Sequence, residues 1–168
     1  TTTGSWPVLN AAFSQTNGKQ FMAKLREDLS AFEYSTIFGT NSTVPNISPT
    51  AFLVDRCENV YVSGWGGGIN RDANYPTAGT SGLTVVGSLN GSSASTDGSD
   101  LYFFVLAKNA TSQLYGDFFG QIGGFGEHVD GDTSRFDENG VIYQALCANC
   151  GQRPKPTFPT GPSGGVFA

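Results

Sequence analysis

The sequence has little charge, and positive charge is the scarcest. Asp, Glu, Lys and Arg make up only 14% of its 168 residues, against roughly 25% in an ordinary globular domain. Nine Lys and Arg stand against 14 Asp and Glu, which gives a formal net charge of −5. Because no basic stripe exists to displace counterions from phosphates, we expect no nucleic-acid partner.

Long apolar runs are also missing. No run approaches the ~20 residues that a membrane-spanning helix needs, so we expect no insertion into a bilayer. A basic start followed by an apolar segment is absent as well, which predicts no signal peptide in this sequence. A mature secreted chain would show the same pattern.

What the sequence does contain favours strands. It has 23 glycines, 13 phenylalanines and 6 tyrosines, but a single methionine. Together with many Ser, Thr and Asn residues, this is the composition of short strands joined by tight turns. The length suits one domain with its own core, and the fold class that we expect is all-β. Few charges with many small polar residues are common in secreted and cell-surface β proteins.

The sequence describes nearly the same unit twice, about 81 residues apart. The matched residues are Phe21, Tyr34, Phe38, Gly39, Asp55, Val60 and Tyr61 in the first copy and Tyr102, Tyr115, Phe119, Gly120, Asp137, Ile142 and Tyr143 in the second. Subtraction gives an offset of 81 for the first four matches and 82 for the last three, which indicates one loop insertion. Tyr75-Pro-Thr also returns as Phe158-Pro-Thr. Such periodicity is typical of proteins built by stacking repeated units.

Each copy is predicted to form four short antiparallel strands. The expected strands are Gln20–Leu25, Phe32–Phe38, Ala51–Asp55 and Val60–Trp65, then Leu101–Ala107, Gln113–Phe119, Thr133–Asp137 and Val141–Cys147. The last two strands of each copy are separated by a link of hairpin length, and Asn139-Gly140 is a strong hairpin signal. A helix over Lys19 to Ala31 is rejected because the matched strand Leu101–Ala107 is extended.

The grouping that we expect is two four-stranded units, with cores at about 18–66 and 98–150 and edge loops at 67–97 and 151–168. The strand Leu101–Ala107 is apolar on both faces, which predicts that it lies between two layers. The polar stretch between the units is longer than an ordinary connection. Its apolar segment around Leu83 predicts a loop packed along the edge of the sheet rather than a flexible linker.

An acidic group surrounds the only histidine. It consists of Glu127, Asp130, Asp132 and Asp137, near His128. Asp130-Gly-Asp-Thr-Ser resembles the start of a calcium loop, but Arg135 replaces the glycine and Val141 the glutamate that an EF-hand requires. A calcium site of another kind at Asp130 and Asp132 is an alternative to the favoured interpretation, a solvated acidic loop.

The three cysteines are Cys57, Cys147 and Cys150. Cys147 and Cys150 have the spacing of half a zinc site, and Cys57 with His128 would complete a Cys3His set. Because a second Cys-x-x-Cys pair is missing, we favour a disulfide, either within the 147–150 turn or from Cys57 to one of the other two.

Aromatic residues at strand ends and in loops are candidate sugar-binding groups. Trp65, Tyr75, Phe125 and Phe158 have ring faces that could stack on sugars, although filling gaps between layers is the favoured interpretation. The glycine clusters at 66–68 and 123–126 lack the Gly-Lys-Ser/Thr ending of a phosphate loop. No Gly-x-Ser-x-Gly elbow exists, so we predict no catalytic residue and no enzyme activity.

Several segments resemble the repeats of bacterial seven-bladed β-propeller proteins. They are Ser48-Pro-Thr-Ala-Phe-Leu-Val-Asp55, Asn59-Val-Tyr-Val-Ser-Gly-Trp65, Tyr75-Pro-Thr77, Thr96-Asp-Gly-Ser-Asp-Leu-Tyr-Phe103 and Thr133-Ser-Arg-Phe-Asp-Glu-Asn-Gly-Val-Ile-Tyr-Gln144. The chain is most similar to propeller regions of very large Bacteroidota cell-surface proteins, which are exported by the type IX secretion system and often carry a gliding-motility-associated domain.

This resemblance implies two propeller-type blades within a larger β-propeller, in an extracellular or surface-attached protein. It implies a non-enzymatic scaffold or adhesin in adhesion or gliding motility, without a cofactor. The alternative is a carbohydrate-binding propeller assisted by calcium. Two units fall short of the roughly four to eight blades that closure needs. The expected partners are therefore neighbouring blades of the same protein or further copies of the chain, with glycans or surface proteins as further possibilities.

Overall fold

The structure is a computed structural model that describes residues 5–66, 79–87, 100–119, 127–128, 134–139, 141–145 and 147–148. Its described part is all-β, as predicted, and its sheets are antiparallel and not closed into a barrel. The helical content is one 3-10 turn, η1, at Lys108–Ala110. In these residues there is no helix with the length and apolar character to cross a membrane.

The strands fall where the sequence predicts them. They are β1 (Gln20–Leu25), β2 (Phe32–Phe38), β3 (Ser48–Val54), β4 (Val60–Trp65), β5 (Leu101–Leu106), β6 (Gln113–Phe119), β7 (Glu127–His128), β8 (Ser134–Phe136), β9 (Ile142–Gln144) and β10 (Cys147–Ala148). The predicted bounds of β1, β2, β4 and β6 are confirmed to the residue. The short strand β7 and the turn η1 were not predicted, and the predicted single strand Val141–Cys147 is found as two short strands, β9 and β10.

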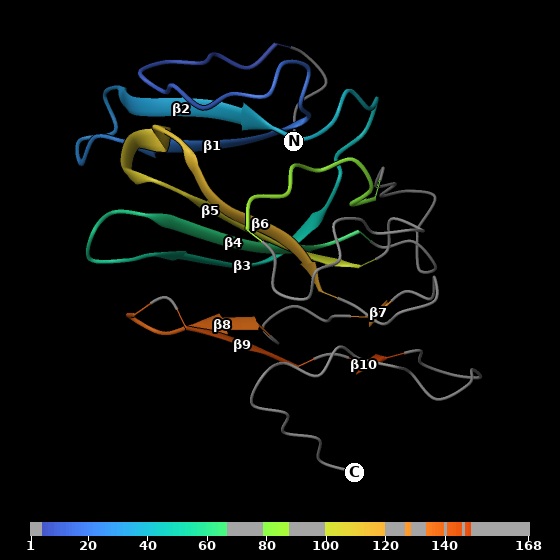
Figure 1. Cartoon of the computed structure of the whole chain (residues 1–168). Coiled ribbons are helices and arrows are strands. Elements are labelled where there is room, and N and C mark those ends of the chain that lie inside the picture. The colour runs from blue at the N-terminus through green and yellow to red at the C-terminus, as the bar shows by residue number, and fades with distance from the viewer. Residues whose placement is uncertain are drawn as a thin grey trace.

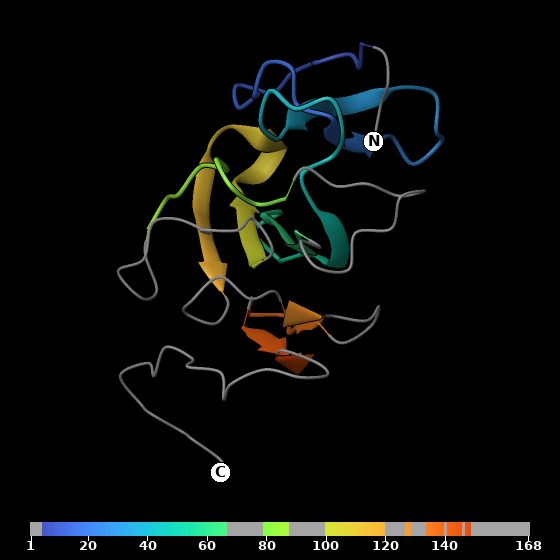
Figure 2. The same ribbon diagram turned by 90° about the vertical axis from the view of Figure 1, so that its right-hand side faces the viewer.

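The strands form three stacked layers. Figure 1 shows the β1–β2 hairpin above a four-stranded sheet of order β3-β4-β5-β6, with the β8–β9 hairpin below it. Figure 2 shows the same order after a quarter turn about the vertical axis. The strands β7 and β10 form a further two-stranded pair.

The expectation that each copy forms its own four-stranded sheet is wrong. The central sheet takes β3 and β4 from the first copy and β5 and β6 from the second. The reason is the long ladder between β4 and β5, which runs from Val60 opposite Leu106 to Trp65 opposite Leu101. This pairing encloses β5 between two strands and satisfies both of its backbone edges.

The first hairpin of each copy has the same register. The pairs Gln20↔Phe38 and Leu25↔Phe32 in β1–β2 recur as Leu101↔Phe119 and Leu106↔Gln113 in β5–β6. Each residue is shifted by 81. An irregularity of the ladder also recurs at the same place, after Lys24 in β1 and after Val105 in β5. The two hairpins are therefore structural copies.

The second hairpin of each copy also repeats, with the offset of 82. The pairs Phe52↔Val62 and Val54↔Val60 in β3–β4 recur as Ser134↔Gln144 and Phe136↔Ile142 in β8–β9. The matched aspartates have the same role in the two turns. Oδ1 of Asp55 accepts the backbone N–H groups of Cys57 and Asn59, each at 2.8 Å. Oδ1 of Asp137 accepts those of Asn139 and Val141 at 2.8 and 2.9 Å.

A short segment before each first hairpin bonds to the middle of its second strand. Leu9 forms a bridge with Ser35 of β2, and Val86 forms one with Gly116 of β6. Ser35 and Gly116 are again 81 residues apart. Because Leu83 is buried in the core, the prediction that this part of the long loop packs against the sheet is confirmed for residues 79–87.

The core lies on both faces of β5, as predicted, and all six residues of this strand are buried. Tyr102, Phe104 and Leu106 face the β1–β2 layer and join the larger apolar cluster. There the ring of Phe104 lies 5.1 Å from that of Phe38, which belongs to β2. Leu101 and Phe103 belong to a second cluster on the other side.

Candidate functional site

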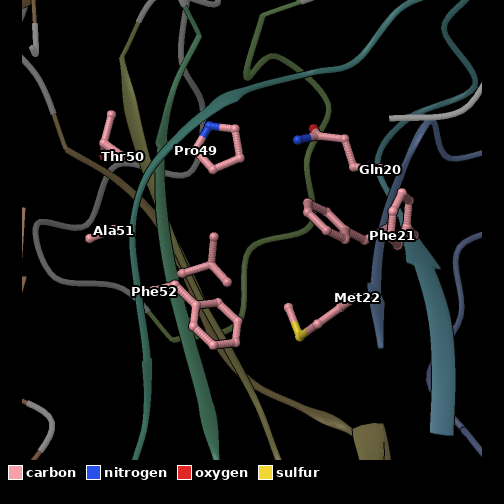
Figure 3. A pocket seen from close by; sticks show the side chains of 9 residues that line it. Gln20, Phe21, Met22, Pro49, Thr50, Ala51 and Phe52 are labelled. Atoms are coloured by element: carbon pink, nitrogen blue, oxygen red, sulfur yellow. The ribbon is translucent and has the colours of Figure 1, made fainter. Parts of the chain in front are cut away.

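A hollow in the described part of the chain lies between β1 and β3. It consists of two cavities of about 500 and 400 Å³. Phe52 lines both cavities, so we treat them as one groove, called here the β1–β3 groove. Figure 3 shows Met22 of β1 and Phe52 of β3 pointing toward one another across the larger cavity. The smaller cavity continues along Leu25 and Val54.

The groove exposes large apolar side chains. The exposed fractions of Phe52, Val54 and Leu25 are 63, 48 and 47%. Within the described residues, β3 is an edge strand of the central sheet and β1 has only β2 as a strand neighbour. Exposed apolar residues beside strand edges mark a surface for association with another chain or segment.

Buried polar contacts fix one end of the groove. The side chain of Gln20, at the start of β1, donates to the Ile47 carbonyl at 3.0 Å. Its carbonyl oxygen accepts the backbone N–H groups of Asn46 and Ile47 at 3.1 and 3.0 Å. Asn46 in turn donates to the Gly79 carbonyl at 2.9 Å. Because these groups are buried and paired, the chain enters β3 in a fixed position beside β1.

Charged side chains close the other end. Glu58, in the β3–β4 turn, accepts hydrogen bonds from Lys108 at 2.5 Å and Lys24 at 3.0 Å. Lys24 also pairs with Glu33 at 2.7 Å. The two lysines hold the pKa of Glu58 below its usual value, and the hydrogen bonds to Glu33 and Glu58 raise the pKa of Lys24. These contacts connect the β1–β2 layer to the central sheet.

The opposite face of the central sheet contacts the β8–β9 layer. The rings of Tyr61 and Phe136 lie 5.8 Å apart. Near them Arg56 pairs with Glu138 at 2.5 Å, so the two matched turns lie against each other. One aromatic contact and one ion pair thus connect successive second hairpins.

The carboxylate of Asp55 stabilises the β3–β4 turn, which begins at this residue. Its Oδ2 accepts hydrogen bonds from the Asn59 amide at 2.9 Å and from the Tyr61 hydroxyl at 3.1 Å. Partial desolvation raises the pKa of Asp55, but the bonds from Asn59, Tyr61 and Cys57 outweigh it and lower the pKa below its usual value. The pKa of Tyr61 is raised, chiefly by burial and then by its bond to Asp55.

Trp65 is the one predicted sugar-stacking residue that the structure describes. It lies at the end of β4, half-buried, and packs against Leu101 and Phe103. Its ring therefore fills space beside β5, in line with the favoured interpretation. Tyr75, Phe125, Phe158, Asp130, Asp132 and Cys150 lie outside the described residues. In the part of the chain that is described, no group of three or more acidic, His or Cys residues is placed to hold a metal ion.

Of the residues of the predicted Cys3His set, Cys57 is the one whose side chain the structure describes. Cys57 is a free, exposed thiol in the β3–β4 turn, so it forms no disulfide. Cys147 is paired with His128 at the far end of the β8–β9 hairpin, beyond the turn that contacts Arg56. A bond between Cys147 and Cys150 stays a prediction.

Comparison with known proteins gives no relative: no family model, curated protein or solved structure matches the chain.

The β1–β3 groove was not predicted from the sequence. The sequence contained two signals for the contact between successive second hairpins, which lies on the opposite face of the central sheet. Arg56 and Glu138 have opposite charges at matched positions, and Tyr61 matches Tyr143. Their meaning depends on which strands pair, which the sequence does not show.

Proposed function

We propose that this chain is a non-enzymatic repeat module of an extracellular protein, acting as a scaffold or adhesin that extends a surface. The observation that carries the proposal is the recurrence of both hairpins with unchanged register. The strand pairing, the turn aspartate and the short segment that bridges to each first hairpin all recur. A unit that repeats in this way forms an extended structure by stacking.

The use of the polar groups supports a structural role. Asp55 and Asp137 receive backbone hydrogen bonds of their turns. The lowered pKa of Asp55 follows from the same turn contacts, with Tyr61 as one of the donors. A perturbed carboxylate is often a sign of catalysis, but at Asp55 hydrogen bonds within the fold account for it.

A β-propeller is the architecture that we propose for the complete assembly. The four-stranded antiparallel sheet has the strand number of one blade. The β1–β2 hairpin then belongs to the preceding blade and the β8–β9 hairpin to the following one. The resemblance to propeller repeats of Bacteroidota surface proteins and the low charge of the chain favour an extracellular location.

Antibody labelling of intact source cells tests the location. An antibody against the folded chain should label cells without permeabilisation, and cells that lack the protein should attach less well to surfaces. Labelling that requires permeabilisation would overturn the extracellular role.

A glycan array with and without a calcium chelator tests the role itself. The scaffold proposal expects no binding in either condition. Binding that the chelator abolishes would instead establish the calcium-assisted carbohydrate-binding alternative, with Asp130, Asp132 and the loop aromatics as its candidate residues.

A further inference from the structure

The strands β1 and β5 occupy the same place in the repeat but have different neighbours. β5 pairs with β6 on one edge and with β4 on the other. Within the described residues β1 pairs with β2 alone, although it matches β5 at an offset of 81 in register and irregularity. By the repeat, the second edge of β1 should therefore pair with a strand that is equivalent to β4.

The chain contains such a strand in β9. Ile142 and Tyr143 match Val60 and Tyr61 of β4 at the offset of 82. Among the described strands β9 pairs only with β8. It cannot reach β1 of its own chain, because the central sheet lies between the two hairpins in both views (Figures 1 and 2).

We propose that the β8–β9 hairpin of a second copy of this chain docks into the β1–β3 groove and pairs β9 with β1. The result is a second four-stranded sheet of order β8-β9-β1-β2, formed by two chains. The repeat fixes its register, because Tyr61 opposite Val105 corresponds to Tyr143 of the second copy opposite Lys24. This inference names the partner of the repeat module and rests on the function proposed above.

The exposed apolar residues fit this contact between two copies, called here the junction. Inside the chain, Tyr61 of one layer packs on Phe136 of the next. The matched residues at the junction are Tyr143 of the second copy and Val54, whose exposed fractions are 58 and 48%. Docking would cover both residues, as well as Phe52 and Leu25 in the groove.

The charges at the turns are complementary in the same way. Arg56 pairs with Glu138 of the layer below. Since these residues are matched at the offset of 82, the junction places Glu138 of the second copy on the other side of Arg56. Arginine and glutamate then alternate along the stack, which favours this register over one with like charges opposed.

The interface is heterologous, because a hairpin of one copy enters a groove of the next. Each added copy offers both a new groove and a new hairpin. Such contacts generate rings when the rotation closes and filaments when it does not.

Mixing two blocked variants tests the junction. Phe52→Glu with Val54→Glu blocks the groove and leaves the hairpin intact, whereas Tyr143→Glu blocks the hairpin and leaves the groove intact. By light scattering, the wild-type chain should form multiples of 17.7 kDa that grow with concentration, and each variant alone should stay at one chain. Their equimolar mixture has one working junction and should form dimers only.

Leu114→Glu is the matched control, because Leu114 is also 48% exposed but lies on β6, outside the groove. It should assemble like the wild type. Circular dichroism checks that each variant keeps its sheet, and Phe52→Ser replaces the groove variant if the charged one unfolds.

Three results would overturn the proposal: a wild-type chain that stays monomeric, a mixture that does not dimerise, or assembly lost equally in the Leu114→Glu control. If assembly fails while the protein is found on intact cells, only the second-copy partner is removed. If the protein is not extracellular, the proposed function fails regardless of assembly.

A pair of cysteine variants tests the register. A chain with Lys24→Cys mixed with a chain with Tyr143→Cys should form a mixed disulfide, because directly opposite residues of an antiparallel pair lie within disulfide reach. Lys24→Cys mixed with wild-type chain is the control for the natural thiol of Cys57. Equal crosslinking in both mixtures would contradict the register.

Discussion

The strands β1 and β5 are the same element of the repeat in two different environments. Their sequences are QFMAKL and LYFFVL, and their partners in the first hairpin align pair by pair. Yet β5 is fully buried, whereas β1 becomes more exposed along its length and ends at Leu25, which is 47% exposed. The comparison shows that the ladder of a hairpin is local, while the burial of a strand depends on its second edge and on the layers around it.

The largest difference is expected at the last residue of the two strands. Leu106 of β5 is fully buried, whereas the matched residue of β1, Leu25, is 47% exposed. Leu106→Ala should lower the free energy of unfolding by about 2–5 kcal/mol, because it leaves a cavity in the core. Leu25→Ala should lower it by less than about 1 kcal/mol, since half of its surface is already in water.

Denaturant unfolding of the two variants at low protein concentration measures this difference. Equal losses would contradict the assignment of β1 as an edge strand. A loss for Leu25→Ala that grows with protein concentration would instead support coverage of the groove by a second copy.

The next effect concerns the two short segments that bridge to the first hairpins, at Leu9 opposite Ser35 and at Val86 opposite Gly116. A Cβ atom at Gly116 would lie 2.6 Å from the Thr84 carbonyl oxygen and from the Tyr102 hydroxyl. Its match, Ser35, has room for a side chain, which donates to the Pro7 carbonyl at 2.8 Å and accepts from the Trp6 ring N–H at 2.7 Å. The backbone bridges of the two copies have similar lengths, but there is room for a side chain at Ser35 and none at Gly116.

Gly116→Ser should lower the free energy of unfolding by about 1–3 kcal/mol through overpacking. Ser35→Gly should lower it by about 1 kcal/mol per hydrogen bond lost. Hydrogen exchange of the Val86 amide, which donates to Gly116 at 2.8 Å, shows whether the segment detaches. Unchanged protection of this amide in Gly116→Ser would show that the close contact is not as described.

A smaller effect separates the two aspartate turns. Asp55→Asn removes the charge that receives bonds from Asn59 and Tyr61, so it should lower the melting temperature more than Asp137→Asn. The folded-state pKa of Asp55 is lowered. Its contribution is therefore complete above the unfolded pKa of about 3.9 and is lost as pH falls through the folded value.

Thermal melts of the wild type and Asp55→Asn should thus differ at pH 6 and converge as the pH falls below about 4. A difference that persists at pH 2 would mean that the carboxylate acts through shape and not through its charge. Asp137→Asn, measured over the same range, is the matched control.

The smallest effect is expected at Glu58. Its backbone φ is +63°, and the sequence has Gly140 at the matched position of the second copy. Glu58→Gln keeps the backbone but removes the ion pairs with Lys24 and Lys108, and it should lower the melting temperature slightly. Because the groups are exposed, added salt should remove most of the difference. A salt-independent difference would assign the effect to packing.

The sequence predicted the strands well because their signals are local. Alternating apolar residues, the turn residues of the β3–β4 and β8–β9 links and the two-fold match identified their places. The matched strand correctly excluded a helix over Lys19–Ala31. The apolar character of Leu101–Leu106 on both faces correctly placed this strand between layers.

Most candidate site residues lie outside the described part of the chain, so their roles stay predictions. Among the described ones, Trp65 packs beside β5, its sugar stacking stays a prediction, and Cys57 is a free thiol. The groove residues Phe52 and Val54 were overlooked, because in sequence they are ordinary members of an apolar strand. An exposed surface becomes recognisable only when the neighbouring strands are placed.

The sequence by itself determined the strand positions, the two-fold repeat and the turn chemistry, since each depends on residues near one another in the chain. Only the tertiary structure decided that β4 pairs with β5 across a long connection. Backbone hydrogen bonds are nearly the same for any strand partner, so the choice depends on which pairing buries the most apolar surface. Because β4 pairs with β5, the four-stranded sheet combines the second hairpin of one copy with the first hairpin of the next. The same pairing leaves a groove beside β1 that matches the β8–β9 hairpin at the other end of the chain.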